Sequence, residues 1–161
     1  GLAAVLGGTG APVRARAAAM SCLSVCASIG VSDSLSEGKS RFLAEVDKIR
    51  QALTAGGDQQ PVLFLFDELF SGTNSTDRRI AAEAVIRELV SAGAIGAVST
   101  HDLTLAEIAE LPELSGENVH MASRSNDDPL SFDYELKPGI CRQSNALGII
   151  RLAGVSVPQR V

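Results

Sequence analysis

Two carboxylates and an imidazole follow apolar segments, at places where the chain would leave a β-sheet. Asp67 and Glu68 come directly after the apolar run 62–66, and His101 follows a second apolar run at 94–100. Five apolar residues without alternation are typical of a strand buried on both faces of a parallel sheet. Both groups are therefore expected at the carboxyl edge of one sheet, where open α/β sheets bind ligands. A histidine beside two carboxylates there is a candidate active-site group, because imidazole exchanges protons near neutral pH.

A second candidate site lies at the start of a helix. Gly38 and Ser40 precede an amphipathic segment in which charged and polar residues, Glu45 among them, occupy the face opposite the apolar positions. Ser40 fits a helix N-cap that satisfies free backbone amides. Alternatively, a glycine, a serine hydroxyl and free amides at a helix N-terminus form a site for a phosphate. Taken alone, this segment favours the interpretation of Ser40 as a helix N-cap over that of a phosphate site.

Composition limits the classes of protein to which the chain can belong. Its 161 residues are 45% hydrophobic and 20% charged, which fits one globular domain and not a disordered chain. The net charge of −5 gives no general attraction for nucleic acid or an anionic membrane. The three cysteines are too few for a disulfide framework, and no Cys/His set has zinc spacing. With neither a signal peptide nor a membrane-spanning run, we expect a cytoplasmic protein with reduced thiols.

Hydrophobic periodicity and turn residues predict the remaining elements. The strand, helix and strand that begin at Pro61 form a right-handed βαβ unit, so the two strands should be close neighbours in one sheet. His120 is expected to be a half-exposed strand residue. The predicted buried faces are Phe42, Val46, Ile49 and Leu53 in the first long helix and Ile80, Ala84, Val85 and Leu89 in the second. The expected order is helix 1–6, strand 24–31, helix 40–55, strand 62–66, helix 77–92, strand 94–100, helix 103–111, hairpin strands 117–123 and 131–136, and helix 147–152.

The glycines near the start of the chain do not form a phosphate loop. The segment Gly7-Gly8-Thr9-Gly10 has neither the spacing of G-x-x-x-x-G-K-[ST] nor its lysine. We interpret it as the end of an apolar helix. No Walker A motif occurs anywhere in the chain.

Several motifs in order resemble those of the MutS family of DNA mismatch-repair ATPases. Asp67-Glu68-Leu-Phe-Ser-Gly-Thr-Asn-Ser-Thr-Asp77 and Ser99-Thr-His-Asp102 are similar to its Walker B, D-loop and switch-histidine series. The spacing of Asp33, Leu35, Gly38, Ser40, Phe42 and Glu45 resembles its signature segment. Gly10-Ala-Pro-Val13 and the segment 139–147 also fit. The likeness is strongest to the MutS-like branch with Gly-Thr-Asn-Ser and Thr-His-Asp.

The resemblance implies an α/β, ABC-type P-loop NTPase fold, present here as a partial domain. Its sheet would be mostly parallel, flanked by helices, with an antiparallel hairpin. The implied segments are a signature helix at 33–55, Walker B and D-loop at 61–77, the switch histidine at 94–102, the hairpin at 117–137 and a terminal helix at 144–154.

The resemblance also implies roles for individual residues around ATP and Mg²⁺. Asp67 would hold the metal, Glu68 would polarise the attacking water, and His101 would contact the γ-phosphate. The remaining implied nucleotide-binding residues, shared across the interface between two copies of the domain, are Gly38, Ser40, Gly72, Thr73, Asn74, Ser75 and Asp77.

Since the Walker A loop is missing, we expect the chain to belong to a larger protein. That protein would be an ATP-driven dimer switch that contacts DNA through other regions and has no membrane segment. Two alternatives stay open: a non-catalytic interaction module with an ATPase fold, and an ABC-type ATPase of an assembly without DNA. A phosphate loop upstream would favour the enzyme, and basic patches farther upstream would favour DNA.

Overall fold

The computed structural model describes residues 1–30, 41–55, 60–123, 130–131, 133–142 and 146–156. They form two compact units, Gly1–Leu105 and Ala106–Val161, which we describe separately. The candidate site residues among them all lie in the first unit.

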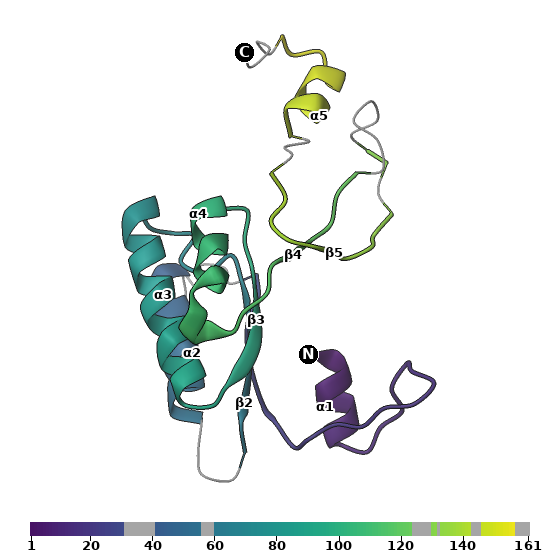
Figure 1. Ribbon diagram of the computed structural model, residues 1–161, viewed down its shortest axis with the longest axis vertical. Coiled ribbons are helices and arrows are strands. Elements are labelled where there is room, and N and C mark those ends of the chain that lie inside the picture. Colours follow the sequence, from purple (N-terminus) through teal and green to yellow (C-terminus); the bar gives the residue numbers. More distant parts are fainter. Residues whose placement is uncertain (31–40, 56–59, 124–129, 132, 143–145, 157–161) are drawn as a thin grey trace. The chain divides into compact units, whose positions relative to one another are not determined.

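A three-stranded parallel sheet is the centre of the first unit (Figure 1). Its strands are β1 (Ser24–Ser28), β2 (Val62–Asp67) and β3 (Ile95–Ser99), with β2 in the middle. The register pairs Phe64 with Cys26 on one side and with Gly96 on the other. A Cβ at position 96 would overlap the Phe64 ring, so glycine allows this ring to lie close to β3. The parallel βαβ arrangement and the α/β class predicted from the sequence are confirmed.

The two faces of β2 are not equally buried. Val62, Phe64 and Phe66 are buried, whereas Leu63 and Leu65, on the opposite face, are half-buried. In the neighbouring β3, Ile95 is 56% exposed. The prediction of a strand buried on both faces therefore holds for one face and only in part for the other. Residues 62–66 are apolar on both sides of the strand because one face is buried and the other is partly buried.

Two long helices pack beside the sheet, α2 (Arg41–Ala55) and α3 (Ser75–Ser91) (Figure 1). The buried positions of α2 are Glu45, Ile49 and Ala52. The predicted face was wrong at Phe42, which is 41% exposed, and at Glu45, which is only 3% exposed. Hydrophobic periodicity does not predict a buried carboxylate, because a partner that allows the burial, the Phe70 amide, belongs to a distant segment of the chain.

The predicted buried face of α3 was correct at Leu89 and wrong at Ile80 and Ala84. Ala82 and Leu89 are buried, while Ile80 is 64% exposed and Ala84 is exposed. Arginine at position 78 and alanine at position 82 lie one turn apart, and both point away from solvent. Arginine and alanine at these positions gave little apolar contrast, so the sequence did not indicate that this side of the helix faces inward.

The first helix, α1 (Leu2–Gly8), confirms the prediction of a short apolar helix that ends in the glycine segment. Its C-cap is Thr9, and Gly10 adopts a left-handed conformation with φ of +75°. Such a residue commonly follows a helix end, and glycine adopts it without strain.

The second unit contains short elements only. Helix α4 (Leu103–Ala106) begins in the first unit and ends at the first residue of the second, where two 3₁₀ turns follow, Glu107–Glu110 and Pro112–Leu114, so Pro112 begins a turn where the sequence predicted a helix end. An antiparallel pair joins β4 (Val119–His120) to β5 (Lys137–Pro138), and α5 spans Ala146–Leu152. The predicted second hairpin strand, 131–136, was wrong: pairing occurs at Lys137 and Pro138. His120 is half-buried in β4, as expected, and its Nδ1 lies 2.9 Å from the Gly139 carbonyl oxygen.

Asn74 is the N-cap of α3. Its side chain accepts a hydrogen bond from the Asp77 amide at 2.9 Å and donates one to the Asp77 carboxylate. Two hydrogen bonds thus join Asn74 and Asp77 in the first turn of the helix. The Asp77 charge is also favourable near the positive end of the helix dipole.

Replacing Asn74 by alanine should lower the free energy of unfolding by about 1 kcal/mol, because the Asp77 amide loses its partner. The matched control is Ser75→Ala, which changes the next residue and leaves the cap intact. Thermal and urea unfolding of both variants measures the difference. Equal losses in the two variants would contradict Asn74 as the cap.

Candidate active site at the carboxyl edge of the sheet

The register of β2 and β3 places the acidic pair beside the end of β3. Asp67 pairs with Ser99, whose hydroxyl donates a hydrogen bond to Asp67 Oδ1. One residue later the Glu68 amide donates to the Ser99 carbonyl oxygen at 3.1 Å. Asp67 itself is exposed at the sheet edge. Backbone pairing therefore continues one residue beyond the strand. It fixes the backbone positions of both acidic residues relative to the end of β3.

Glu68 and His101 form a direct side-chain contact at this edge. His101 Nδ1 lies 2.7 Å from Glu68 Oε2, an ion pair whenever the imidazole is protonated. The His101 side chain is 77% exposed and that of Glu68 is 32% exposed. The structure thus brings together Asp67, Glu68 and His101 on one edge of the sheet. Because the His101 ring is held by little packing, its place depends on its backbone and on this contact.

The turn after β2 has an unusual backbone. Glu68 and Phe70 have φ values of +53° and +56°, in the left-handed region that residues with a Cβ rarely adopt. Leu69 and Phe70 are nevertheless buried, with 1% and 4% exposure. The Phe70 amide donates a 2.6 Å hydrogen bond to the buried Glu45 carboxylate of α2. Sequence reasoning missed this function of Glu45, although the residue is part of the signature pattern quoted for the family resemblance.

The next segment carries the predicted nucleotide-binding residues. Gly72, Asn74, Ser75 and Asp77 are exposed, and Thr73 is half-buried. They run from the turn into the first helical turn of α3, so their exposed backbone and side chains face away from the core. Gly38 and Ser40, the remaining predicted binding residues, lie outside the described residues.

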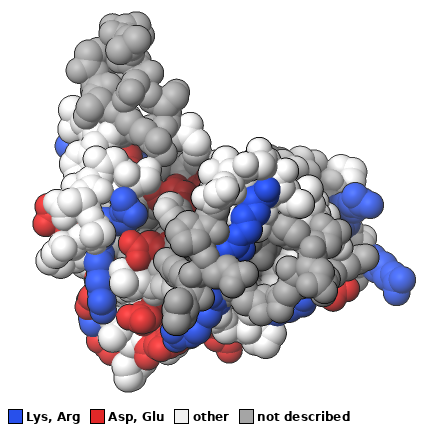
Figure 2. Space-filling view, turned by 90° about the horizontal axis from the view of Figure 1, so that it is seen from above, with Lys and Arg blue, Asp and Glu red and all other residues white. Residues whose placement is uncertain are grey.

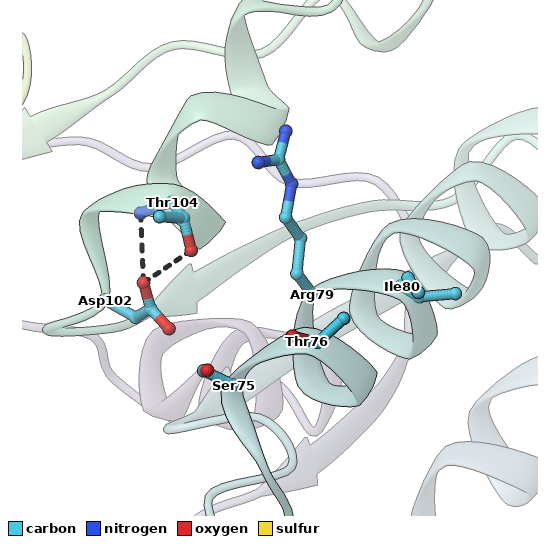
Figure 3. Close-up of a pocket in the computed structure, with 6 residues that line it drawn as sticks. All are labelled: Ser75, Thr76, Arg79, Ile80, Asp102 and Thr104. Atoms are coloured by element: carbon cyan, nitrogen blue, oxygen red, sulfur yellow. Dashed lines mark hydrogen bonds between the residues drawn. The ribbon is translucent and has the colours of Figure 1, made fainter.

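A shallow cavity of about 350 Å³ lies between the start of α3 and the turn after β3. Asp102 and Thr104 line it from the β3 side, and Ser75, Thr76, Arg79 and Ile80 line it from the first two turns of α3 (Figure 3). Ile80, which the helical pattern predicted to be buried, is exposed and lines this cavity.

The described residues contain no group of three or more His, Cys, Asp or Glu side chains arranged to hold a metal. Asp67 offers a single exposed carboxylate. Mg²⁺ binds through one or two carboxylates together with water and substrate phosphates, so Asp67 suits this ion and not an all-protein metal site. Cys22 and Cys26 are free thiols, and burial raises the pKa of the Cys26 thiol above its ordinary value.

The described surface has a mixed charge. On the face shown in Figure 2, acidic and basic side chains lie close together. Within the described parts of the chain, no helix is long and apolar enough to span a bilayer.

Asp102 lies next to His101 and is held as a carboxylate. The Thr104 hydroxyl donates to Asp102 Oδ1 at 2.7 Å and the Thr104 amide at 3.0 Å (Figure 3). The Thr104 hydroxyl, then the Thr104 and Leu105 amides and the Arg78 guanidinium, lower the pKa of Asp102, and partial burial opposes them. The charged form is thus favoured in the folded state.

Because its folded pKa is lowered, the Asp102 charge stabilises the fold above the ordinary carboxyl pKa and loses this effect as pH falls through the lowered value. Asp102→Asn should therefore be less stable than the parent protein near neutral pH, by about 0.3–1 kcal/mol for a charge at a helix start. The difference in unfolding free energy between the two proteins should shrink as the pH is lowered. Thermal unfolding at several pH values measures it, and an offset that stays constant down to the acid range would contradict this origin.

Comparison with known proteins connects these features to a family. The MutS domain V model matches residues 1–161. Over 133 residues, 81% of this chain, the sequence is 33% identical to DNA mismatch repair protein MutS 2 of Halobacterium salinarum, and covers 15% of that protein. It is 32% identical over 136 residues to DNA mismatch repair protein MutS of Psychrobacter cryohalolentis, covering 80% of this chain and 13% of that protein.

A longer match extends over nearly the whole chain. DNA mismatch repair protein MutS 2 of Haloarcula marismortui is 33% identical over 159 residues, which is 96% of this chain and 16% of that relative. The chain thus spans about a sixth or less of the length of these relatives. The full match to the domain model, with the resemblance of the ordered motifs, shows that the chain belongs to the MutS family and corresponds to its domain V.

Proposed function

We propose that this chain is part of an ATP-hydrolysing domain in a larger, DNA-associated protein of the mismatch-repair type. The observation that carries the proposal is the contact between Glu68 and His101 beside Asp67, at the carboxyl edge of a parallel sheet. Ligands bind at this edge in open α/β sheets. The names of the relatives, which are DNA mismatch repair proteins, support the association with DNA.

The proposed chemistry assigns a separate task to each group. Bound Mg²⁺ would neutralise charge on the β- and γ-phosphate oxygens. Asp67 would hold the ion, directly or through water, and its bond from Ser99 fixes one carboxylate oxygen. Glu68 would accept a hydrogen bond from the attacking water and orient it. His101, which is exposed and on the same edge, would contact the γ-phosphate and so report whether that phosphate is present.

The same proposal places a second copy of the domain across the site. Gly72, Thr73, Asn74, Ser75 and Asp77 are mostly exposed at the edge of the first unit, which suits a contact with that copy. Gly38 and Ser40 would reach the nucleotide held by the partner, with helix N-terminal amides toward its phosphates. ATP would then act as a switch between paired and separated copies. DNA would be held by other parts of the protein, and we place the protein in the cytoplasm, where such repair would act.

Replacing Glu68 by glutamine in the protein that carries this chain should lower the rate of steady-state ATP turnover at least about 100-fold, because the base that orients the attacking water is lost. ATP binding should persist, because the amide is isosteric and Asp67 is unchanged. A phosphate-release assay measures turnover, and fluorescence titration with a labelled ATP measures binding. Glu83→Gln, on the surface of α3, is the matched control and should keep both.

The outcomes separate the candidate functions. Unchanged turnover in Glu68→Gln would remove this residue from its role. A parent protein that neither binds nor hydrolyses ATP would instead indicate an interaction module with an ATPase fold. Turnover that does not respond to any DNA would favour an ATPase of another assembly.

A further inference from the structure

Arg78 joins three separate parts of the candidate site. Its Nε donates to the Phe70 carbonyl oxygen at 3.3 Å, and its Nη2 donates to the Thr73 carbonyl oxygen at 3.2 Å. Its Nη1 lies 3.7 Å from Asp102 Oδ2. Only 17% of the Arg78 side chain and 16% of the Asp102 side chain are exposed, so this ion pair is partly shielded from water. One guanidinium from the second turn of α3 thus connects the turn after β2 with the turn after β3.

The turn after β2 requires such support because its backbone is strained. A left-handed conformation is unfavourable for a residue with a Cβ, and both Glu68 and Phe70 adopt it. The Phe70 residue is held on both sides: its amide by Glu45 and its carbonyl oxygen by Arg78. Glu68 lies two residues before this point, so the direction of its carboxylate depends on the turn that Arg78 and Glu45 keep in place.

The turn after β3 depends on Arg78 in a different way. Its own hydrogen bonds are local: the Asp102 amide donates to Thr100 Oγ1 at 3.0 Å, and the Asp102 carboxylate accepts from Thr104. These bonds shape the turn but do not attach it to the turn after β2. Within the described residues, Arg78 links the two turns in addition to the Glu68–Ser99 backbone bond and the contact of His101 with Glu68. His101 immediately precedes the residue that Arg78 holds.

We propose that Arg78 is a positioning residue for ATP hydrolysis, which sets the distance between the Glu68 carboxylate and the His101 imidazole without itself touching nucleotide. The inference rests on the proposed ATPase function. Its planar guanidinium can bond two carbonyl oxygens and a carboxylate at once, which a lysine ammonium on a flexible stem cannot reproduce. The role therefore depends on arginine and not on positive charge alone.

The test is steady-state ATPase kinetics of the protein that carries this chain, with Arg78→Ala, Arg78→Lys and a control. Misplacing a reacting group by about 1 Å can cost about 100-fold in rate. We expect kcat to fall between about 10-fold and 100-fold in both variants, with the KM for ATP within about twofold, because nucleotide contacts are retained. The control, Arg87→Gln, removes a guanidinium that is paired with Glu83 on the same helix, and should keep parental kinetics.

Chemical rescue separates positioning from a general loss of structure. Guanidinium ion at millimolar concentration should restore part of kcat in Arg78→Ala, and should restore nothing in Glu68→Gln. Circular dichroism and thermal unfolding identify a variant that does not fold, and Arg78→Lys then provides the kinetic test, because it retains the alkyl stem and the charge.

The inference is overturned if Arg78→Lys keeps parental kcat, if the loss appears in KM while kcat is unchanged, or if folded Arg78→Ala is not rescued. These outcomes differ from a failure of the proposed function, in which the parent protein itself does not hydrolyse ATP.

Discussion

The parallel pairing of β2 with β3 is the constraint on which the candidate site depends. The register sets Asp67 beside Ser99, and one further backbone bond carries the alignment to Glu68. Side chains at the carboxyl ends of parallel neighbours meet at one edge. A shift of the register by one residue would reverse the side-chain directions of β3 and separate His101 from Glu68. The positions of the proposed catalytic groups thus depend on backbone hydrogen bonds in which no catalytic atom takes part.

The helices add a second constraint, which acts on the turn after β2. Glu45 reaches from α2 to the Phe70 amide, and Arg78 reaches from α3 to the Phe70 carbonyl oxygen. Buried polar groups of this kind are costly unless bonded, so a helix that moved would leave a carboxylate or a backbone group unsatisfied. The two helices are therefore coupled through the backbone of the same residue, Phe70. The packing of α2 and α3 beside the sheet and the geometry near Glu68 are mutually dependent.

The parts of the structure that were predictable from sequence are those with a strong local signal. The apolar run of β2 and the glycines that end α1 are such signals, and the structure confirms the strand and the helix end. The strand order followed from the βαβ connection, so the meeting of Glu68 and His101 could be predicted as well. These features depend on neighbours in the chain or on one topological rule.

The features that were missed depend on partners far away in the chain. Glu45 has the chemistry of a surface residue, and its carboxylate is buried where it accepts a hydrogen bond from the Phe70 amide, 25 residues later. Arg78 gave no signal because its acceptors include backbone carbonyl oxygens, which every residue carries. In the second unit, β5 consists of Lys137 and Pro138, two residue types with low β-propensity. A pair of only two residues gives little local signal, so the sequence did not predict this strand.

The most direct test of the central claim is a crystal structure, with ATP and Mg²⁺, of the protein that carries this chain. The account predicts that the γ-phosphate lies within hydrogen-bonding distance of the His101 imidazole, with the metal on the Asp67 side and a water against Glu68. A nucleotide whose phosphates lie away from the carboxyl edge of β2 and β3 would contradict it.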